Sequence, residues 1–379
     1  MAIKDEIVSW FIRNVAIPKL EIIDHPGFIT MKPMPSKQVY SRQILMSESF
    51  LVNLENKIVE KYGNEGRRAL YSIGKRFGYR FSIMIDLPTI QRCNKKEFLT
   101  LAYFIGRFIE STYAHKVLYK INFDLNEFDL TFDGYVVCRK NGKGYIMTDG
   151  GSAGIWAYAL QDLSVEGVQV KCQGRGDKKC EVICAPPKIL EKKGLTFFKE
   201  TNLEDLEIEY DRYEEMNKIR ETQYAKNSFE DLINIGFFDY SRGVVKHKDE
   251  RYFLCEASLP YIIEMELKKL EGATKILFDC AFDHGKKIAK LQGECNFQEF
   301  MMQFLSACGY GDILVLELGG GYKVTNFYFP WTKFADEVKF EMYRGLVSGL
   351  ISGCLNKEII FNKLEIDTLG KGLTLILSL

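Results

Sequence analysis

The stretch SESFLVNLENKIVEKYGNEGRRALYSIGKRFGYRF, residues 47–81, has a counterpart in ASLPYIIEMELKKLEGATKILFDCAFDHGKKIAKL, residues 257–291. In each stretch the apolar residues recur at the spacing of two successive amphipathic helices. The tripeptide GKR at 74–76 is matched by GKK at 285–287. A repeat of this length predicts two structural copies of one unit.

The elements that follow these helices also occur twice. Each copy continues with a third apolar helix and then with Gly-punctuated, strand-like sequence, at 128–147 and at 312–329. A helix with small residues comes next, and two strands around a glycine turn end the copy. The order α-α-α-β-β-α-β-β, met twice, predicts an α+β fold. We expect two tandem copies of an antiparallel sheet packed with helices, the second copy being degenerate.

The length of 379 residues exceeds what a single core usually supports, so about two domains are expected. We predict an N-terminal helix and hairpin in residues 1–40 and a first domain in residues 41–186. A charged connector that forms a solvated helix is predicted in residues 187–235, and the second domain in residues 236–379. Paired prolines at the start of the connector end the last strand of the first domain.

The composition indicates a protein of a reducing cytoplasm. Basic and acidic residues balance at 51 each, which gives no electrostatic reason to expect nucleic acid or an anionic membrane as a partner. No stretch reaches the roughly 20 consecutive apolar residues of a membrane span, and the N-terminus lacks the pattern of a secretion signal. The ten cysteines are scattered rather than arranged as a dense disulfide framework.

A longer motif, GGSAGIWAYALQDLSVEGVQVKCQGRGDKKCEVI at 150–183, resembles the 4-vinyl-reductase domain family. The resemblance lies in a Gly/Ala-containing helix, a strand ending in Cys, a Gly-Asp turn and a second Cys. The family includes sensor domains of aromatic-responsive bacterial transcription activators and stand-alone archaeal proteins. It implies a fold similar to the TRAPP tethering subunits, with helices packed on an antiparallel sheet around an apolar pocket.

The resemblance also implies a zinc site. In the aromatic sensors the ion is held by this Cys pair, by a Glu three residues before the first Cys, and by a Cys further upstream. Here Cys172 and Cys180 match the pair, Gln169 stands at the Glu position, and Cys138 is the nearest upstream thiol. Gln lacks the charge of Glu, and the upstream Cys position falls near Ile146 and Met147, so two of the four ligands depart from the pattern. A metal site, inert packed thiols and a redox pair therefore stay open as alternatives.

Strand geometry limits which residues join such a site. Cys180 and Cys184 would share one face of a strand about 13 Å apart, too far for one ion, so Cys184 is expected in the core. Glu166 is a further candidate if its strand begins late. In the second copy Ile366 and Thr374 occupy the positions of the Cys pair, which confines any metal to the first copy.

Aromatic residues at helix-facing positions of the first copy are either plain core or the walls of an apolar pocket. The candidate ligand-binding residues are Trp156, Tyr103, Phe104, Phe108 and His115, with Trp156 as the preferred wall residue. The residues that precede Trp156 are small, which lets another group approach this helix closely.

No motif nominates a nucleophile, a general base or a phosphate loop, so a non-catalytic role is favoured, although the question of an enzyme stays open. The leading interpretation is a sensor or carrier that binds an apolar or aromatic small molecule, with a zinc site in the first copy. The alternative is a protein-interaction scaffold that resembles the tethering subunits, and a third is a component of a tetrapyrrole vinyl reductase. A protein partner or a homodimer is compatible with each of them.

Overall fold

The computed structural model describes residues 22–32, 40–92, 95–138, 144–200, 202–203, 217–241, 244–293, 296–319, 321–330, 337–367 and 374–378. The helix predicted at the N-terminus and most of the charged run, residues 204–216, lie outside these residues.

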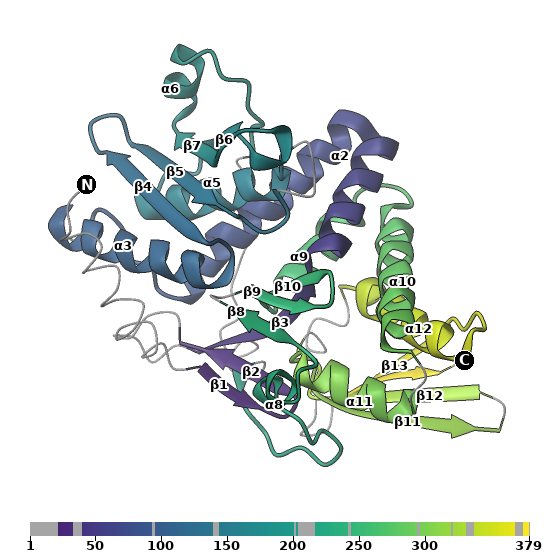
Figure 1. The fold of residues 1–379 in the computed structure, drawn as a ribbon. Coiled ribbons are helices and arrows are strands. Elements are labelled where there is room, and N and C mark those ends of the chain that lie inside the picture. The colour runs from purple at the N-terminus through teal and green to yellow at the C-terminus, as the bar shows by residue number, and fades with distance from the viewer. Residues whose placement is uncertain are drawn as a thin grey trace.

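A six-stranded antiparallel sheet joins the two halves of the chain (Figure 1). Its order is β1 (Ile22–His25), β2 (Phe28–Met31), β3 (Ser41–Ser47), β10 (Glu250–Glu256), β9 (Val244–His247) and β8 (Asp239–Ser241). At its centre β3 runs antiparallel to β10. The predicted N-terminal hairpin is confirmed, since β1 pairs with β2. That hairpin joins the same sheet as β3, so this sheet crosses the predicted boundary at residue 40, and the domain boundaries stay predictions.

The first half packs helices against a four-stranded sheet whose order is β4-β5-β7-β6. Its elements are α2 (Glu48–Met84), α3 (Lys95–Thr112), β4 (Lys116–Asn122), β5 (Glu127–Asp133), α5 (Ile146–Leu160), β6 (Glu166–Lys171) and β7 (Cys180–Ala185). The two helices predicted at 47–81 are merged into α2, which bends at Gly63 because this residue has a positive φ of 55°.

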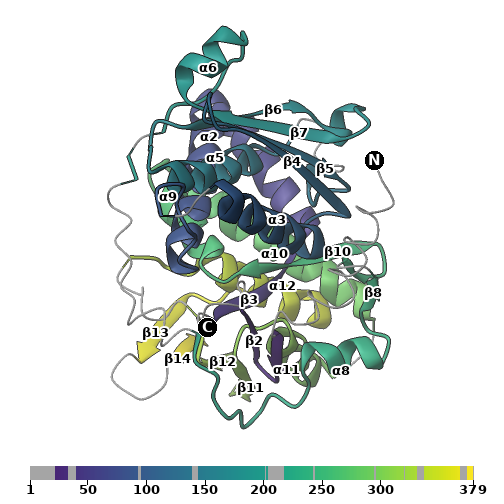
Figure 2. The same ribbon diagram turned by 90° about the vertical axis from the view of Figure 1, so that its left-hand side faces the viewer.

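The second half repeats this arrangement, with the sheet order β11-β12-β14-β13. Its elements are α9 (Leu259–Leu267), α10 (Ala273–Gln292), α11 (Phe297–Ala307), β11 (Asp312–Leu318), β12 (Gly321–Phe327), α12 (Glu341–Leu355), β13 (Lys363–Asp367) and β14 (Thr374–Ser378). The two four-stranded sheets lie at opposite ends of the molecule, with helices between them (Figure 2). The α+β fold with two tandem copies is therefore confirmed.

Glycines bring the two long helices of each half into backbone contact. A Cβ at Gly150 of α5 would lie 2.1 Å from the carbonyl oxygen of Tyr71 in α2, and one at Gly345 of α12 would lie 2.3 Å from that of Phe278 in α10. The small residues before Trp156 therefore allow helix α2 to pack directly against the backbone of α5. This corrects the expectation that they leave room for an unspecified group, because the neighbouring backbone fills that space.

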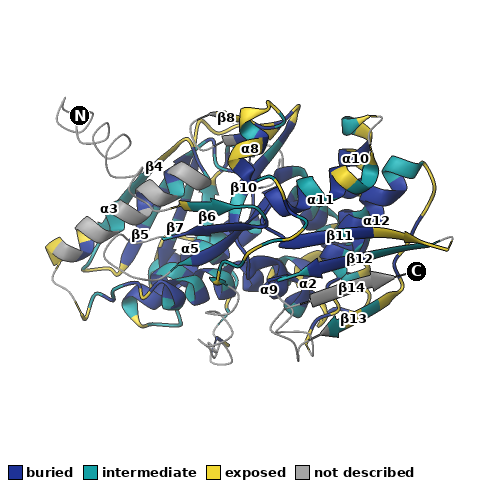
Figure 3. Ribbon diagram, turned by 90° about the horizontal axis from the view of Figure 1, so that it is seen from below, coloured by how far each residue is buried: buried dark blue, intermediate teal, exposed yellow. Residues whose placement is uncertain are grey.

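The chain between the two halves is not one solvated helix in its described parts. It contains α6 (Pro187–Lys192) and α8 (Phe229–Asn234), and residues 195–200 between them are non-helical. The Asp312 carboxylate accepts hydrogen bonds from the backbone of Gln223, Tyr224 and Ala225, so this segment is attached to the second half. Helix α8 and the outer end of β11 carry exposed residues, whereas the inner helices are buried (Figure 3). Among the described residues, no helix combines the length and the apolarity that crossing a bilayer requires.

Candidate functional site

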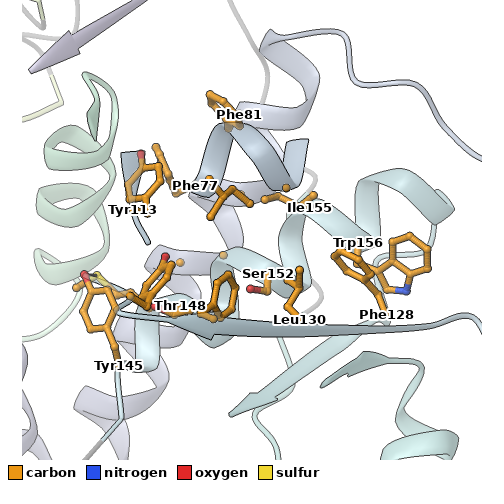
Figure 4. Close-up of a pocket in the computed structure, with 18 of the residues that line it drawn as sticks. Phe77, Phe81, Tyr113, Phe128, Leu130, Tyr145, Thr148, Ser152, Ile155 and Trp156 are labelled. Atoms are coloured by element: carbon orange, nitrogen blue, oxygen red, sulfur yellow. Dashed lines mark hydrogen bonds between the residues drawn. The ribbon is translucent and has the colours of Figure 1, made fainter. Parts of the chain in front are cut away.

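An apolar cavity of about 150 Å³ lies inside the first half, between its helices and its sheet (Figure 4). An apolar cavity of this volume accommodates about one benzene ring. Its described walls come from α2, α3, β4, β5 and α5, and from β10 and α9 of the second half. None of these described lining residues carries a charge, and burying an unpaired charge among them would be costly.

One end of the cavity is formed by aromatic rings. The Trp156 ring lies 4.9 Å from that of Phe128 and 5.9 Å from that of Phe98, measured between centroids. The indole N–H of Trp156 donates a 2.8 Å hydrogen bond to the carbonyl oxygen of Asn126. Trp156 therefore presents its ring to the cavity while its polar atom is satisfied outside it.

The opposite end of the cavity carries hydroxyl groups. Tyr113, Tyr145 and Thr148 lie together there, away from Trp156 and Phe128 (Figure 4), and Tyr135 also lines the cavity. Burial raises the pKa of Tyr113, Tyr135 and Tyr145 above the usual range, so their hydroxyls are neutral. Neutral hydroxyls both donate and accept hydrogen bonds, which suits a hydroxyl or carbonyl group on a ligand.

The predicted ligand-binding residues are placed differently from one another. Trp156 lines the cavity, whereas Tyr103 and His115 are not among its described lining residues. A Cβ built at Gly134 would lie 2.9 Å from the His115 ring, so this ring packs against Gly134. The side chains of Phe104 and Phe108 on α3 lie outside the described residues. The tyrosines at the polar end were missed because most of them lie in loops, which have no periodic pattern.

The second half has a smaller cavity, of about 30 Å³, at the equivalent place. When the first residues of α5 and α12 are aligned, Met147 and Gly151 of the first cavity correspond to Met342 and Leu346 of the second. His284 lines this second cavity, and burial lowers its pKa to about 4, so its ring is neutral at pH 7.

Three thiols form a cluster beside the polar end of the first cavity. The Sγ atoms of Cys138, Cys172 and Cys180 all lie within 4.8 Å of one another, and all three residues are buried. Cys172 follows β6, Cys180 begins β7, and Cys138 belongs to the segment after β5. Cys184 is buried elsewhere on β7, as predicted from strand geometry.

The surroundings favour a thiolate at Cys172 only. Hydrogen bonds with the Cys172 and Cys180 thiols, together with burial, raise the pKa of Cys138. The Cys138 thiol lowers the pKa of Cys180, but the Cys172 thiol and burial outweigh it and raise that pKa to about 11. The Cys138 thiol, followed by the Cys180 thiol and by the backbone N–H groups of Gly174 and Arg175, lowers the pKa of Cys172 well below its usual range. The backbone N–H of Gln173 points at the Cys180 sulfur at 3.4 Å. Such hydrogen-bond donors stabilise negative charge on sulfur, which is the form that binds metals.

The spacing of the three sulfur atoms is close to that of ligands on one Zn²⁺ ion. Tetrahedral zinc with Zn–S bonds of about 2.3 Å places its sulfur ligands about 3.8 Å apart, so a small contraction of the cluster suffices. The Gln169 side chain is the neighbouring group, since its Nε2 lies 3.3 Å from the Cys138 sulfur. The three thiols fit a zinc ion, and a water molecule would complete four ligands, since the Gln169 oxygen is engaged by the backbone N–H of Tyr145.

Glu166 does not belong to this cluster, which corrects the proposal that it might approach the Cys pair. Its carboxylate accepts a 2.6 Å hydrogen bond from the Tyr71 hydroxyl and forms a 2.9 Å ion pair with Lys75. It also accepts a hydrogen bond from the backbone N–H of Glu200, so it holds this part of the connector against α2. A buried carboxylate needs such partners, and here both oxygens of the Glu166 carboxylate have one.

No protein-family model matches the chain, and no curated protein matches it. Among solved structures, the phenol-responsive sensory domain of the transcription activator PoxR, solved with phenol, is similar with a TM-score of 0.33 and 15% sequence identity. That match covers 49% of this chain and 91% of the PoxR domain. Membership of the 4-vinyl-reductase family therefore stays a prediction.

Proposed function

We propose that this protein is a non-catalytic sensor or carrier that binds a neutral, single-ring apolar molecule in the first half. The cavity of about 150 Å³ with hydroxyls at one end and aromatic rings at the other carries this proposal. Its volume suits one ring, and its uncharged walls exclude ionised ligands. A ring that bears a hydroxyl would place its apolar body near Trp156 and its polar group near Tyr113.

The thiol cluster supports a structural role for zinc in the same half. Cys138 follows Tyr135 and Val136, which line the cavity, so a metal bound there would hold this wall to the strands β6 and β7. Gln169 strengthens the connection because its Oε1 accepts a 3.1 Å hydrogen bond from the backbone N–H of Tyr145. With Cys138, Cys172 and Cys180 as ligands, the ion would supply structural rigidity.

Calorimetric titration of the full chain with phenol, benzene and benzoate tests the binding proposal. We expect phenol to bind best, benzene more weakly because it leaves the hydroxyls unpaired, and benzoate not to bind. Tyr113→Phe should weaken phenol about fivefold, the effect of one hydrogen bond, without changing benzene. Equal binding of benzoate and phenol would contradict a neutral cavity.

The interaction scaffold is the less favoured function. A scaffold has no need of an internal cavity and would be expected to fill it, as side chains largely do in the second half. If none of the three probes binds to the folded protein, the scaffold becomes the better interpretation.

A further inference from the structure

The first cavity is not built from the first half alone. Phe253 of β10 and Leu259 of α9, both from the second half, are among its lining residues. Phe253 is only 3% exposed, and its ring lies 5.7 Å from that of Tyr113 between centroids. The second half therefore closes the cavity at the end where the hydroxyls lie.

Two contacts hold Phe253 in this position. The ladder between β3 and β10 places Phe253 opposite Met46. On the other side, the Arg251 guanidinium donates hydrogen bonds of 3.1 and 3.2 Å to the carbonyl oxygen of Gly134, next to the lining residue Tyr135. A side chain held on a paired strand moves less than one on a free loop, so it makes a firm wall.

The next residue along β10 faces the other way. Tyr252 lines the second cavity, and its ring lies 6.3 Å from that of His284. Successive side chains of a strand point to opposite faces of the sheet, so β10 separates the two cavities. A change at position 253 alters the first cavity, and a change at position 252 alters the second.

We infer that the second half is part of the binding site, with Phe253 as the residue that limits the length of the ligand. This inference rests on the proposed function and names the residue that determines its size selectivity. A ligand with its ring near Trp156 would meet Phe253 at the far end, so substituents longer than the cavity are excluded in the wild type.

Titration of the full-length protein with phenol, ethoxybenzene and butoxybenzene provides the test, because the ether oxygen takes the place of the phenol oxygen and the alkyl chain extends past it toward Phe253. The wild type should bind phenol more tightly than butoxybenzene. Phe253→Ala should reverse this order, and butoxybenzene should gain about tenfold, at roughly fourfold for each newly buried methylene. Phe304→Ala is the matched control, since Phe304 is a buried phenylalanine of the second cavity, and it should keep the wild-type order.

A folded Phe253→Ala protein with the wild-type order of affinities would overturn the inference. If that variant fails to fold, Phe253→Leu should shift the order in the same direction by a smaller factor, and an unchanged order would overturn it equally. Xenon binding, followed by ¹²⁹Xe NMR, separates the two proposals because it needs no specific ligand. If no phenol binds, the proposed function fails. In that case a larger xenon uptake by Phe253→Ala than by the wild type still supports Phe253 as a wall of the cavity. Equal uptake by the two proteins overturns the inference.

Discussion

The two halves share one backbone arrangement but differ in what their centres hold. The first half encloses about 150 Å³ and the second about 30 Å³. Helices α5 and α12 keep glycines at equivalent positions, Gly150 with Gly345 and Gly154 with Gly349, because their partner helices approach closely in both halves. Among the positions that face the cavities, Met147 and Met342 are the same residue, whereas Gly151 is replaced by Leu346. This comparison separates residues needed for the fold from residues that shape a binding site.

Side-chain volume explains the difference between the cavities. Gly151 and Thr148 of α5 are replaced by Leu346 and Tyr343 at the equivalent positions of α12. Leu346 lines the second cavity, whereas Tyr343 is buried outside its described lining, where its hydroxyl accepts a 2.8 Å hydrogen bond from Asn326. Larger side chains at the centre of the second half make more van der Waals contacts, and they leave less volume for a ligand.

The largest expected effect comes from the glycines that the halves share. Gly150→Ala should lower the free energy of unfolding by about 3 kcal/mol, because its Cβ would lie 2.1 Å from the Tyr71 carbonyl oxygen. Urea unfolding measures this loss. The matched control is Gly151→Ala, whose Cβ would meet its nearest atom, the Gly74 carbonyl oxygen, at an ordinary 3.7 Å. Equal midpoints for the two variants would contradict the role assigned to the glycine contact.

The thiols are a second difference between the halves, since Ile366 and Thr374 stand where the first half has Cys172 and Cys180. Elemental analysis of the purified protein should find about one zinc per chain, as three thiolates and a fourth ligand would bind. The double variant Cys172→Ser/Cys180→Ser should contain none. Cys184→Ala removes a buried thiol from the same strand and should retain the metal. If the wild type contains no metal, the zinc proposal fails, and the three thiols are either inert core residues or a redox-active pair.

Exchanging one side chain between the halves should convert the first cavity toward the second. Gly151→Leu places the side chain of Leu346 into the first cavity and should weaken phenol about a hundredfold, as a ligand and a leucine compete for the same space. Since no atom crowds a Cβ at this position, the protein should stay folded by circular dichroism. Leu346→Gly should enlarge the second cavity and raise its xenon uptake. Unchanged phenol affinity in Gly151→Leu would place the ligand elsewhere.

The smallest of these effects concerns the junction of the halves. Burial alone would raise the pKa of Glu250, but hydrogen bonds from Lys287, Ser47 and Ser49 outweigh it and lower the pKa from 4.5 to about 2. A lowered carboxyl pKa stabilises the folded state above pH 4.5, and this contribution is lost as the pH falls toward 2. Glu250→Gln should therefore reduce stability by on the order of 2 kcal/mol at pH 7, after allowance for solvent screening.

Urea midpoints of Glu250→Gln and wild type, measured between pH 7 and pH 2, should converge as the pH falls. Glu358→Gln, at an exposed position, should follow the wild type throughout. A difference that is independent of pH would mean that the carboxylate charge of Glu250 is not the stabilising feature.

Much of the fold is predictable from the sequence because it depends on local patterns. Helical periodicity, strand-like segments and glycine turns recur in one order along both copies, and they specify the α+β architecture and the duplication. The same reasoning confined Cys184 to the core and brought Cys172 and Cys180 together across a short turn. Trp156 is predicted as a wall residue because its small neighbours let another group approach. It does line the cavity, although the backbone of α2 occupies the space beside those neighbours.

Other features depend on contacts between residues far apart in the chain, which no local pattern records. The sequence spacing leaves Cys138 distant from Cys172, and only the fold brings their sulfurs within 4.8 Å. Glu166 is engaged by Lys75 and Tyr71 of a distant helix, and Phe253 reaches the first cavity because β10 pairs with β3. Periodicity over neighbouring residues thus specifies the repeated elements. The cavity, its closing residue and the thiol cluster arise only in the folded chain, since each depends on how distant elements pack.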